Sequence, residues 1–139
     1  MTINKIRKSL HEHIKEGQRL GFTLKAGGAR SYRDSNNHHY DHPDDISYQP
    51  CACLLGMLCL GISDKTFADL RSKHRYTSIL NILYTETSSA LGISLEEAKE
   101  LEEGFEGIKK QKASLRGDMI ALEEHEYSEM YQLGKEFAA

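Results

Sequence analysis

The amino-acid sequence predicts a mainly α-helical protein that folds as a single domain over residues 1–139. Three observations lead to this fold class: the chain has only two prolines, apolar residues recur at helical spacing, and helix-capping residues precede several of these patterns. A domain of this length buries about two-thirds of the surface that its unfolded chain exposes, so it needs no disulfide or metal to stay folded. We expect five or six helices around one buried central helix.

The first predicted helix runs from about Ile3 to Gln18. Ile6, Leu10 and Ile14 recur every four residues, and charged side chains stand between them. Thr2 is a residue type that caps helix N-termini. The predicted helix is therefore amphipathic and packs one face against the core.

Residues 21–49 carry turn signals in place of a helical pattern. Gly27-Gly28 and Pro43-Asp44-Asp45 are both typical of turns and exclude a helix interior. We predict a polar loop from Ser31 to Asp45. We also predict a short β-hairpin at one edge of the domain, between about residues 22 and 48.

The buried central helix is predicted at about residues 50–61. The run from Ala52 to Leu60 is apolar on all sides, which is typical of a helix enclosed by a core. Pro50 suits the first turn of a helix, where a missing N–H breaks no hydrogen bond. The apolar run is too short to cross a membrane, so no membrane partner is expected.

The second half of the chain alternates between helical patterns and connectors. A weak helical segment is expected over residues 63–70, a longer helix over residues 76–92, and another over residues 95–104. Residues 107–117 are predicted to form a basic, irregular connector. The last helix is expected to begin near Asp118.

The distribution of charge limits the classes of partner. The net charge is −3, but residues 94–139 hold twelve acidic and only six basic side chains. Phosphate binding needs clustered positive charge, so nucleic acid is not an expected partner of this part of the chain. The acidic residues suit either a solvated face or a docking face for a basic partner.

The cysteines and the N-terminus indicate a compartment. Cys51, Cys53 and Cys59 are three in number, which rules out a complete set of intramolecular disulfides. The N-terminal residues lack the apolar segment of a secretory signal. We therefore expect a reducing, cytoplasmic environment.

Four residues near the middle of the chain are candidate metal ligands. Zinc prefers four nitrogen and sulfur ligands, and His38, His42, Cys51 and Cys53 offer that chemistry. The two histidines have a spacing that zinc fingers use, whereas Cys-x-Cys is tighter than the usual Cys-x2-Cys. The pattern also fits a solvated loop followed by small buried cysteines, and we favour that interpretation. The sequence thus predicts no cofactor, with zinc as the alternative.

Cys51 is also a candidate nucleophile. At the N-terminus of the predicted central helix, the helix dipole would lower the pKa of its thiol, and His42 is a candidate base. However, the sequence shows no strand pattern for the sheet on which cysteine hydrolases are usually built. No catalytic residue is therefore assigned.

The segment from Ser88 to Lys99 resembles a helix-turn-helix. Ser94-Leu95-Glu96-Glu97 has the capping-box pattern that begins its second helix. That helix, Leu95 to Glu103, carries five glutamates and one lysine, which the phosphates of DNA would repel. We expect the motif as structure only, and we assign its glutamates to a solvated face rather than to a pair of catalytic acids.

The segment Pro50-Cys51-Ala52-Cys53-Leu54-Leu55-Gly56-Met57-Leu58-Cys59 resembles a run found in many small phage and prophage proteins. Those proteins carry Cys-Cys-Leu-Gly-Val-Leu-Cys after an N-terminal helix and a polar, glycine-containing loop, and the order of parts is similar here over about the first 60 residues. In this chain Ala52 separates the cysteines, and an extra leucine precedes Gly56. The resemblance implies a phage or mobile-element origin and a buried helix, and it transfers no catalytic residue.

Together these patterns favour a non-enzymatic protein-interaction or regulatory accessory factor of phage or prophage type. Its expected partner is a protein, bound by the acidic C-terminal helices, by the histidine-rich loop, or by both. The alternative is a small metal- or thiol-dependent enzyme that uses His42, Cys51 and Cys53. The sequence predicts neither the identity of the partner nor the oligomeric state.

Overall fold

The computed structural model describes residues 2–27, 31–33, 39–40, 49–60 and 76–138. These residues are mainly helical, as the sequence predicts. None of the helices in these ranges is both long and apolar enough to cross a membrane. The segment expected to form a weak helix, residues 63–70, lies outside the described residues.

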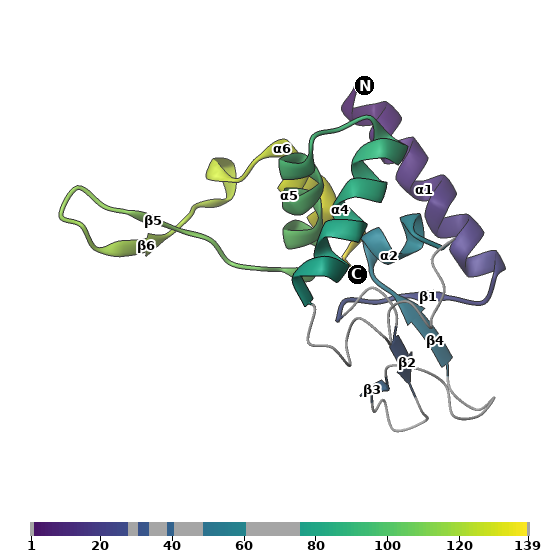
Figure 1. Cartoon of the computed structure of the whole chain (residues 1–139). Helices are drawn as coiled ribbons and strands as arrows, with labels where there is room; N and C mark the ends of the chain where they lie inside the picture. Colours follow the sequence, from purple (N-terminus) through teal and green to yellow (C-terminus); the bar gives the residue numbers. More distant parts are fainter. Residues whose placement is uncertain (1, 28–30, 34–38, 41–48, 61–75, 139) are drawn as a thin grey trace.

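Five α-helices are present in the described ranges (Figure 1). Their bounds are Ile3–Arg19 for α1, Leu54–Leu58 for α2, Tyr76–Leu91 for α4, Leu95–Glu106 for α5 and Glu129–Phe137 for α6. Helix α2 contacts α1, α4 and α5, and α6 packs along α5. The buried side chains of all five helices form one hydrophobic core.

Helix α1 confirms the first predicted helix. Thr2 is its N-cap, and its side chain accepts a hydrogen bond from the backbone N–H of Lys5. Ile6, Leu10 and Ile14 are buried against the core, as their spacing predicts. The helix ends one residue later than expected, at Arg19.

The predicted edge hairpin is replaced by a four-stranded sheet. Its strands are β1 (Thr23–Leu24), β2 (Ser31–Arg33), β3 (His39–Tyr40) and β4 (Gln49–Ala52), in the order β1-β4-β2-β3. Strand β1 runs parallel to β4, whereas β2 is antiparallel to both β4 and β3. The expected partner of β1 near residues 46–48 lies outside the described residues. The expected polar loop over residues 31–45 contains β2 and β3, which are too short to show an alternating pattern.

The central helix is much shorter than predicted. Residues 49–52 form β4, and helix α2 covers only Leu54–Leu58. Cys53 is the N-cap of α2, and its Sγ accepts a hydrogen bond of 3.3 Å from the backbone N–H of Gly56. An apolar run that is buried on all sides looks alike in a strand and in a helix, which explains the error over residues 50–52.

Helices α4 and α5 form the predicted helix pair. Ser94 and Glu97 make the predicted capping box, with reciprocal side-chain to backbone hydrogen bonds of 3.0 Å. Helix α5 does not close at Gly104 but continues to Glu106. It stops at Gly107, which adopts a left-handed backbone conformation.

Gly104 lies inside α5 because α6 crosses there at very close range. A Cβ at Gly104 would collide with the backbone carbonyl of Tyr131 in α6. In the same way, a Cβ at Gly134 in α6 would collide with the backbone carbonyl of Leu101 in α5. The two glycines therefore bring the two helix backbones into direct contact.

Residues 107–128 differ most from the sequence prediction. The expected connector and the expected start of the last helix near Asp118 instead form an antiparallel hairpin, β5 (Gln111–Ala113) and β6 (Met119–Ala121). A 3-10 helix follows over Glu124–Glu126, and α6 begins only at Glu129. We call residues 107–122 the arm, because the hairpin projects away from the helices (Figure 1). The arm contributes no residue to the core.

Candidate functional site

The outer part of the arm exposes apolar side chains. Leu115 at the tip is 109% exposed, Met119 is 61% exposed, and Ile120 is also exposed, as is Ile108 close to the end of α5. Side chains of this type are usually buried, and several of them on one small projection are unusual for a protein surface. The arm is therefore the first candidate for a functional surface.

The root of the arm is held by two tyrosines of the C-terminal segment. The hydroxyl of Tyr131 donates a hydrogen bond of 2.7 Å to the backbone carbonyl of Ile108. The hydroxyl of Tyr127 accepts one of 3.1 Å from the backbone N–H of Lys110. The two tyrosine rings stack, with their centroids 4.1 Å apart. We call these contacts of Tyr127 and Tyr131 the clamp. The clamp joins the arm to α6 and fixes the direction in which the hairpin projects from the helices.

Two ion pairs support the same root. Lys110 pairs with Glu103 of α5 at 3.2 Å, and Lys112 pairs with Glu126 of the 3-10 helix. Within the described part of the chain, neither Lys109 nor Arg116 makes an ion pair. These two cations therefore flank the exposed apolar side chains without an acidic partner among those residues.

The tip of the arm is a tight turn closed by backbone hydrogen bonds. Gly117 has a φ of +83° and donates a hydrogen bond of 2.9 Å to the carbonyl of Ser114. Such a φ favours glycine, so the turn depends on this residue. A surface hollow of about 540 Å³ lies here, with Leu115, Arg116 and Ile120 among its lining residues. In the ranges that the structure covers, β5 and β6 pair only with each other, which leaves both outer strand edges open.

The cysteines that were candidate ligands or nucleophiles are buried, as in the interpretation that the sequence favours. Cys51 lies in β4 and not at a helix N-terminus, so the predicted effect of a helix dipole on its thiol is wrong. Its Sγ–H donates to the backbone carbonyl of Gln49 at 3.6 Å. His38 and His42, the other predicted ligands, lie outside the described residues. The structure thus does not test the proposed meeting of these histidines with Cys51 and Cys53.

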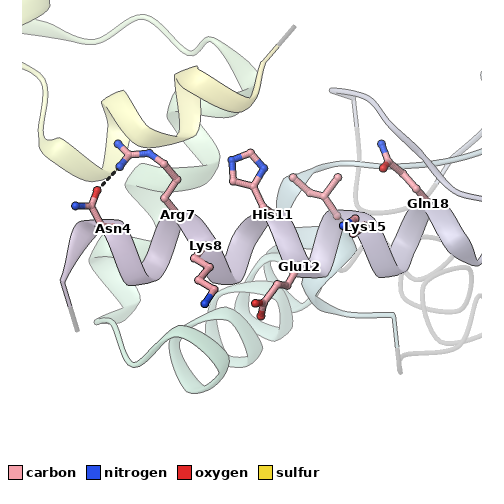
Figure 2. A pocket seen from close by; sticks show the side chains of 8 residues that line it. Asn4, Arg7, Lys8, His11, Glu12, Lys15 and Gln18 are labelled. Carbon is pink, nitrogen blue, oxygen red and sulfur yellow. Dashed lines mark hydrogen bonds between the residues drawn. The ribbon is translucent and has the colours of Figure 1, made fainter.

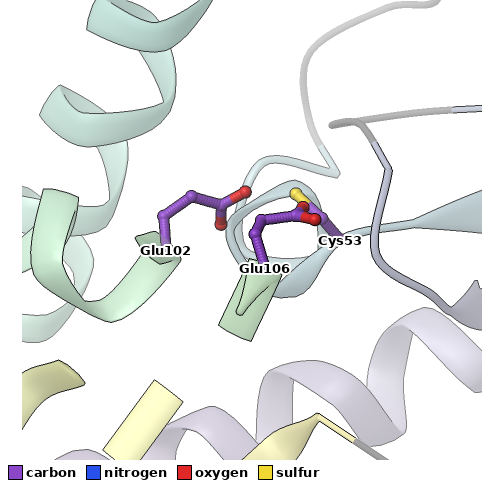
Figure 3. Close-up of side chains that lie close together, drawn as sticks. All are labelled: Cys53, Glu102 and Glu106. Carbon is purple, nitrogen blue, oxygen red and sulfur yellow. The ribbon is translucent and has the colours of Figure 1, made fainter. Parts of the chain in front are cut away.

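Cys53 is instead close to two glutamates of α5, and we call these three residues the thiol–carboxylate cluster (Figure 3). The Sγ of Cys53 and one carboxylate oxygen each of Glu102 and Glu106 lie within 4.8 Å of one another. Glu102 is only 8% exposed, whereas Glu106 is partly exposed. Glu106 also accepts a hydrogen bond of 3.1 Å from the backbone N–H of Gly27, just after β1.

Burial determines the protonation of this cluster. Burial, and then the negative charge of Glu106, raise the pKa of Glu102 to about 8. Burial likewise raises the pKa of the Cys53 thiol well above its usual range. A thiol with a raised pKa is a poor nucleophile, but the three groups together offer one sulfur and two oxygen ligands.

Glu102 and Glu106 were not predicted as site residues. The glutamates of this helix were expected on a solvated face, and Glu96 and Glu97 are exposed. Ala98, Glu102 and Glu106 recur every four residues, and this row lies beside the buried face of α5. That spacing was the feature of the sequence that could have identified Glu102 and Glu106.

A second surface hollow, of about 720 Å³, lies along α1, and it does not form a site. Its lining comes from α1 alone, and Figure 2 shows these side chains spreading to both sides of the helix instead of converging. Arg7 is engaged in a two-fold ion pair with Glu136 of α6, with both distances 2.9 Å. His11 lies against the ring of Phe137, with centroids 4.7 Å apart. Arg7 and His11 therefore link α1 to α6.

Comparison with known proteins finds no matching family model and no significant match among curated proteins or solved structures.

Proposed function

We propose that the chain is a non-enzymatic interaction factor that docks onto a partner protein through its arm. The observation that carries this proposal is the clamped hairpin with exposed apolar side chains at its outer end. An isolated two-stranded hairpin is marginally stable in water. A hairpin that is fixed at its root and apolar at its tip is therefore better suited to binding than to stabilising its own domain.

The clamp lowers the cost of binding. Docking a mobile loop loses conformational entropy, whereas a hairpin already held by Tyr127 and Tyr131 has lost much of it before the partner arrives. The apolar area of Leu115, Met119 and Ile120 then contributes on contact, at about 25 cal/mol for each Å² removed from water.

The chemistry of the arm specifies the kind of partner. Leu115 and Ile120 require an apolar cleft, and Arg116 at the tip and Lys109 at the root favour carboxylates at the rim of that cleft. The open edges of β5 and β6 offer backbone hydrogen bonds to an added strand. We infer a protein partner with an acidic rim around an apolar cleft. The resemblance of residues 50–59 to phage and prophage proteins supports an accessory role of this kind.

The proposal is tested by placing a photo-crosslinking amino acid at position 115 and, as a control, at exposed Lys15 on α1. We expect crosslinking in cells to give a protein adduct from position 115 that is absent from position 15. The adduct should disappear when Ile120→Asp is added, while the thermal midpoint of the purified variant stays unchanged because Ile120 is exposed.

Two outcomes would contradict the proposal. If positions 115 and 15 give the same adducts, the arm has no specific partner. If the adduct survives Ile120→Asp, the apolar face of the arm does not make the contact. An adduct between two copies of this chain, supported by concentration-dependent sedimentation, would show that the arm binds a second copy of the chain and not a different protein.

A thiol-dependent enzyme is the weaker alternative. The thiolate is the reactive form of cysteine, and the raised pKa of Cys53 disfavours it. The metal-dependent alternative has more support, from the thiol–carboxylate cluster, although with a ligand set different from the one that the sequence suggested.

A further inference from the structure

The thiol–carboxylate cluster combines residues from two separate parts of the core. Cys53 lies at the junction of β4 and α2, and Glu102 and Glu106 lie one turn apart on α5. In Figure 3 both carboxylate groups are directed toward the sulfur. The side chains therefore converge from two elements on one point, which side chains of a solvated helix face do not do.

One carboxylate oxygen of Glu102 is buried without a hydrogen-bond partner in the described part of the chain. It is 8% exposed, and among the residues that the structure describes its Oε2 has no hydrogen-bond partner. A buried carboxylate oxygen without a partner costs more than an ordinary lost hydrogen bond, and such exceptions in folded proteins require an explanation. Cys53, Glu106 and the backbone of Leu55 interact with the Glu102 carboxyl group, but this oxygen itself has no hydrogen-bond partner among the described residues.

We propose that Cys53, Glu102 and Glu106 form a zinc-binding site. Zinc binds cysteine sulfur at about 2.3 Å and carboxylate oxygen at about 2.1 Å, which places ligand atoms about 3.5 Å apart in a tetrahedral site. The three candidate atoms lie within 4.8 Å of one another, so side-chain movements of about 1 Å would complete the geometry. Three protein ligands leave the fourth position to water.

The ligand set selects the class of metal. Calcium and magnesium prefer oxygen ligands alone, whereas a thiolate favours zinc and related soft or borderline ions. Binding replaces protons: the Cys53 thiol and the neutral form of Glu102 each release one to solvent as the ion enters. The positive charge of the ion then offsets most of the negative charge of these three ligands, which burial otherwise disfavours.

Zinc bound at this site would stabilise the packing of α2 against α5 and would not affect the arm. It would tie α2 to α5 through Cys53 and Glu102, and Glu106 already contacts the backbone of Gly27 beyond β1. Because these residues lie outside the arm, the inference does not rest on the proposed docking function.

The test measures zinc binding to the untagged, reduced full chain by calorimetry and by metal content after dialysis. We expect one ion per chain and a rise in the thermal midpoint with zinc but not with magnesium. Cobalt in place of zinc should give the near-ultraviolet absorption of a cobalt–thiolate bond, which reports Cys53 directly.

Two pairs of variants locate the site. Glu102→Gln keeps the shape of the side chain and should weaken zinc binding by more than about 100-fold, whereas Glu96→Gln, on the exposed face of the same helix, should leave it unchanged. Cys53→Ser should abolish the cobalt–thiolate band, and Cys59→Ala, which alters another buried cysteine, should keep it.

Glu102→Gln keeps the inference falsifiable if Cys53→Ser fails to fold, because a neutral glutamine replaces a buried carboxyl group of the same shape. Zinc binding that survives Glu102→Gln would overturn the proposal, including the case in which His42→Ala removes it instead. Failure to bind zinc, with the wild-type chain folded and reduced, would overturn it as well. None of these outcomes changes the crosslinking expected from the arm.

Discussion

At the scale of single residues, Glu102 shows how position changes the chemistry of a side chain. It stands among several glutamates on α5, yet it is buried, and its pKa is raised to about 8. A carboxyl group with a raised pKa favours folding only while it is protonated. Without metal, its contribution to stability is fully present below pH 4.5, the ordinary pKa, and is lost as the pH rises to about 8.

This gives a prediction for the metal-free protein. The free energy of unfolding should fall between pH 4.5 and about 8, the ordinary and the raised pKa of Glu102. Each unit of pKa shift corresponds to about 1.4 kcal/mol, so the fall should be on the order of a few kcal/mol. Glu102→Gln should remove most of this slope, because glutamine has no proton to lose. Urea titrations in the presence of a chelator, at a series of pH values, measure it.

The control for this prediction is Glu96→Gln, which changes an exposed glutamate of the same helix. It should leave the pH dependence of unfolding as it is in the wild type. A slope that persists in Glu102→Gln would show that another group is responsible and that Glu102 is ionised in the native protein at neutral pH.

The sequence could not separate Glu102 from its neighbours. Glu96, Glu97 and Glu100 are the same residue type in the same helix, and only packing against α2 decides which side chain loses contact with water. Cys53 was one of several candidate ligands, but its neighbours in the structure come from a segment about fifty residues further along the chain. Sequence spacing carries no information about such contacts unless the topology is known.

At the scale of elements, the crossing of α5 and α6 depends on two glycines. A Cβ at Gly104 would meet the backbone carbonyl of Tyr131, and backbone cannot move aside as a flexible side chain can. Gly104→Ala should therefore destabilise the fold by more than about 2 kcal/mol, although alanine is the better helix former by about 1 kcal/mol. Thermal and urea unfolding measure the difference.

Gly17→Ala is the matched comparison, since Gly17 is also buried inside a helix. Its added Cβ would meet the sulfur of Met57, the far end of a flexible side chain that can shift. We expect a clearly smaller loss of stability than for Gly104→Ala. A loss of stability for Gly104→Ala as small as that expected for Gly17→Ala would mean that α5 and α6 can move apart at little cost, contrary to their close packing.

The sequence predicted the long elements well and the short ones poorly, for a physical reason. Helices α1 and α4 extend over four turns or more, so their apolar periodicity stands out, and the capping box of α5 is a local signal. Strands of two to four residues have no measurable period. Gly104 was taken as a helix end because glycine at a helix end and glycine at a helix crossing look alike in a sequence.

At the scale of the whole molecule, the structure separates into a core that holds the fold and an arm that stays outside it. The core draws on all five helices of the described ranges, and none of its residues lies between 107 and 122. Residues 107–117 of the arm were predicted as a basic connector, because Lys109, Lys110 and Lys112 dominate this segment and strands of three residues have no recognisable pattern. Its exposed apolar residues are the feature that the fold leaves unexplained.

Replacing residues 111–121 with Asn-Gly tests this separation. The two-residue turn suits a hairpin closure between Lys110 and Leu122, which are already joined by a backbone hydrogen bond of 3.0 Å. Leu115, Met119 and Ile120 are exposed and lie outside the core, and the lost Lys112–Glu126 ion pair is partly exposed, so the free energy of unfolding should change by less than about 1 kcal/mol.

The shortened chain should also bind zinc as the full chain does, because Cys53, Glu102 and Glu106 all remain, while partner crosslinking from the arm is lost. The measurements are urea unfolding, calorimetry with zinc, and recovery of the partner in competition with the full chain. If the shortened chain fails to fold, the hairpin stabilises the domain. Its exposed apolar side chains would then be no evidence for a binding partner. If it folds and still competes for the partner, the docking surface lies on the helices, where the acidic residues of α5 become the next candidate.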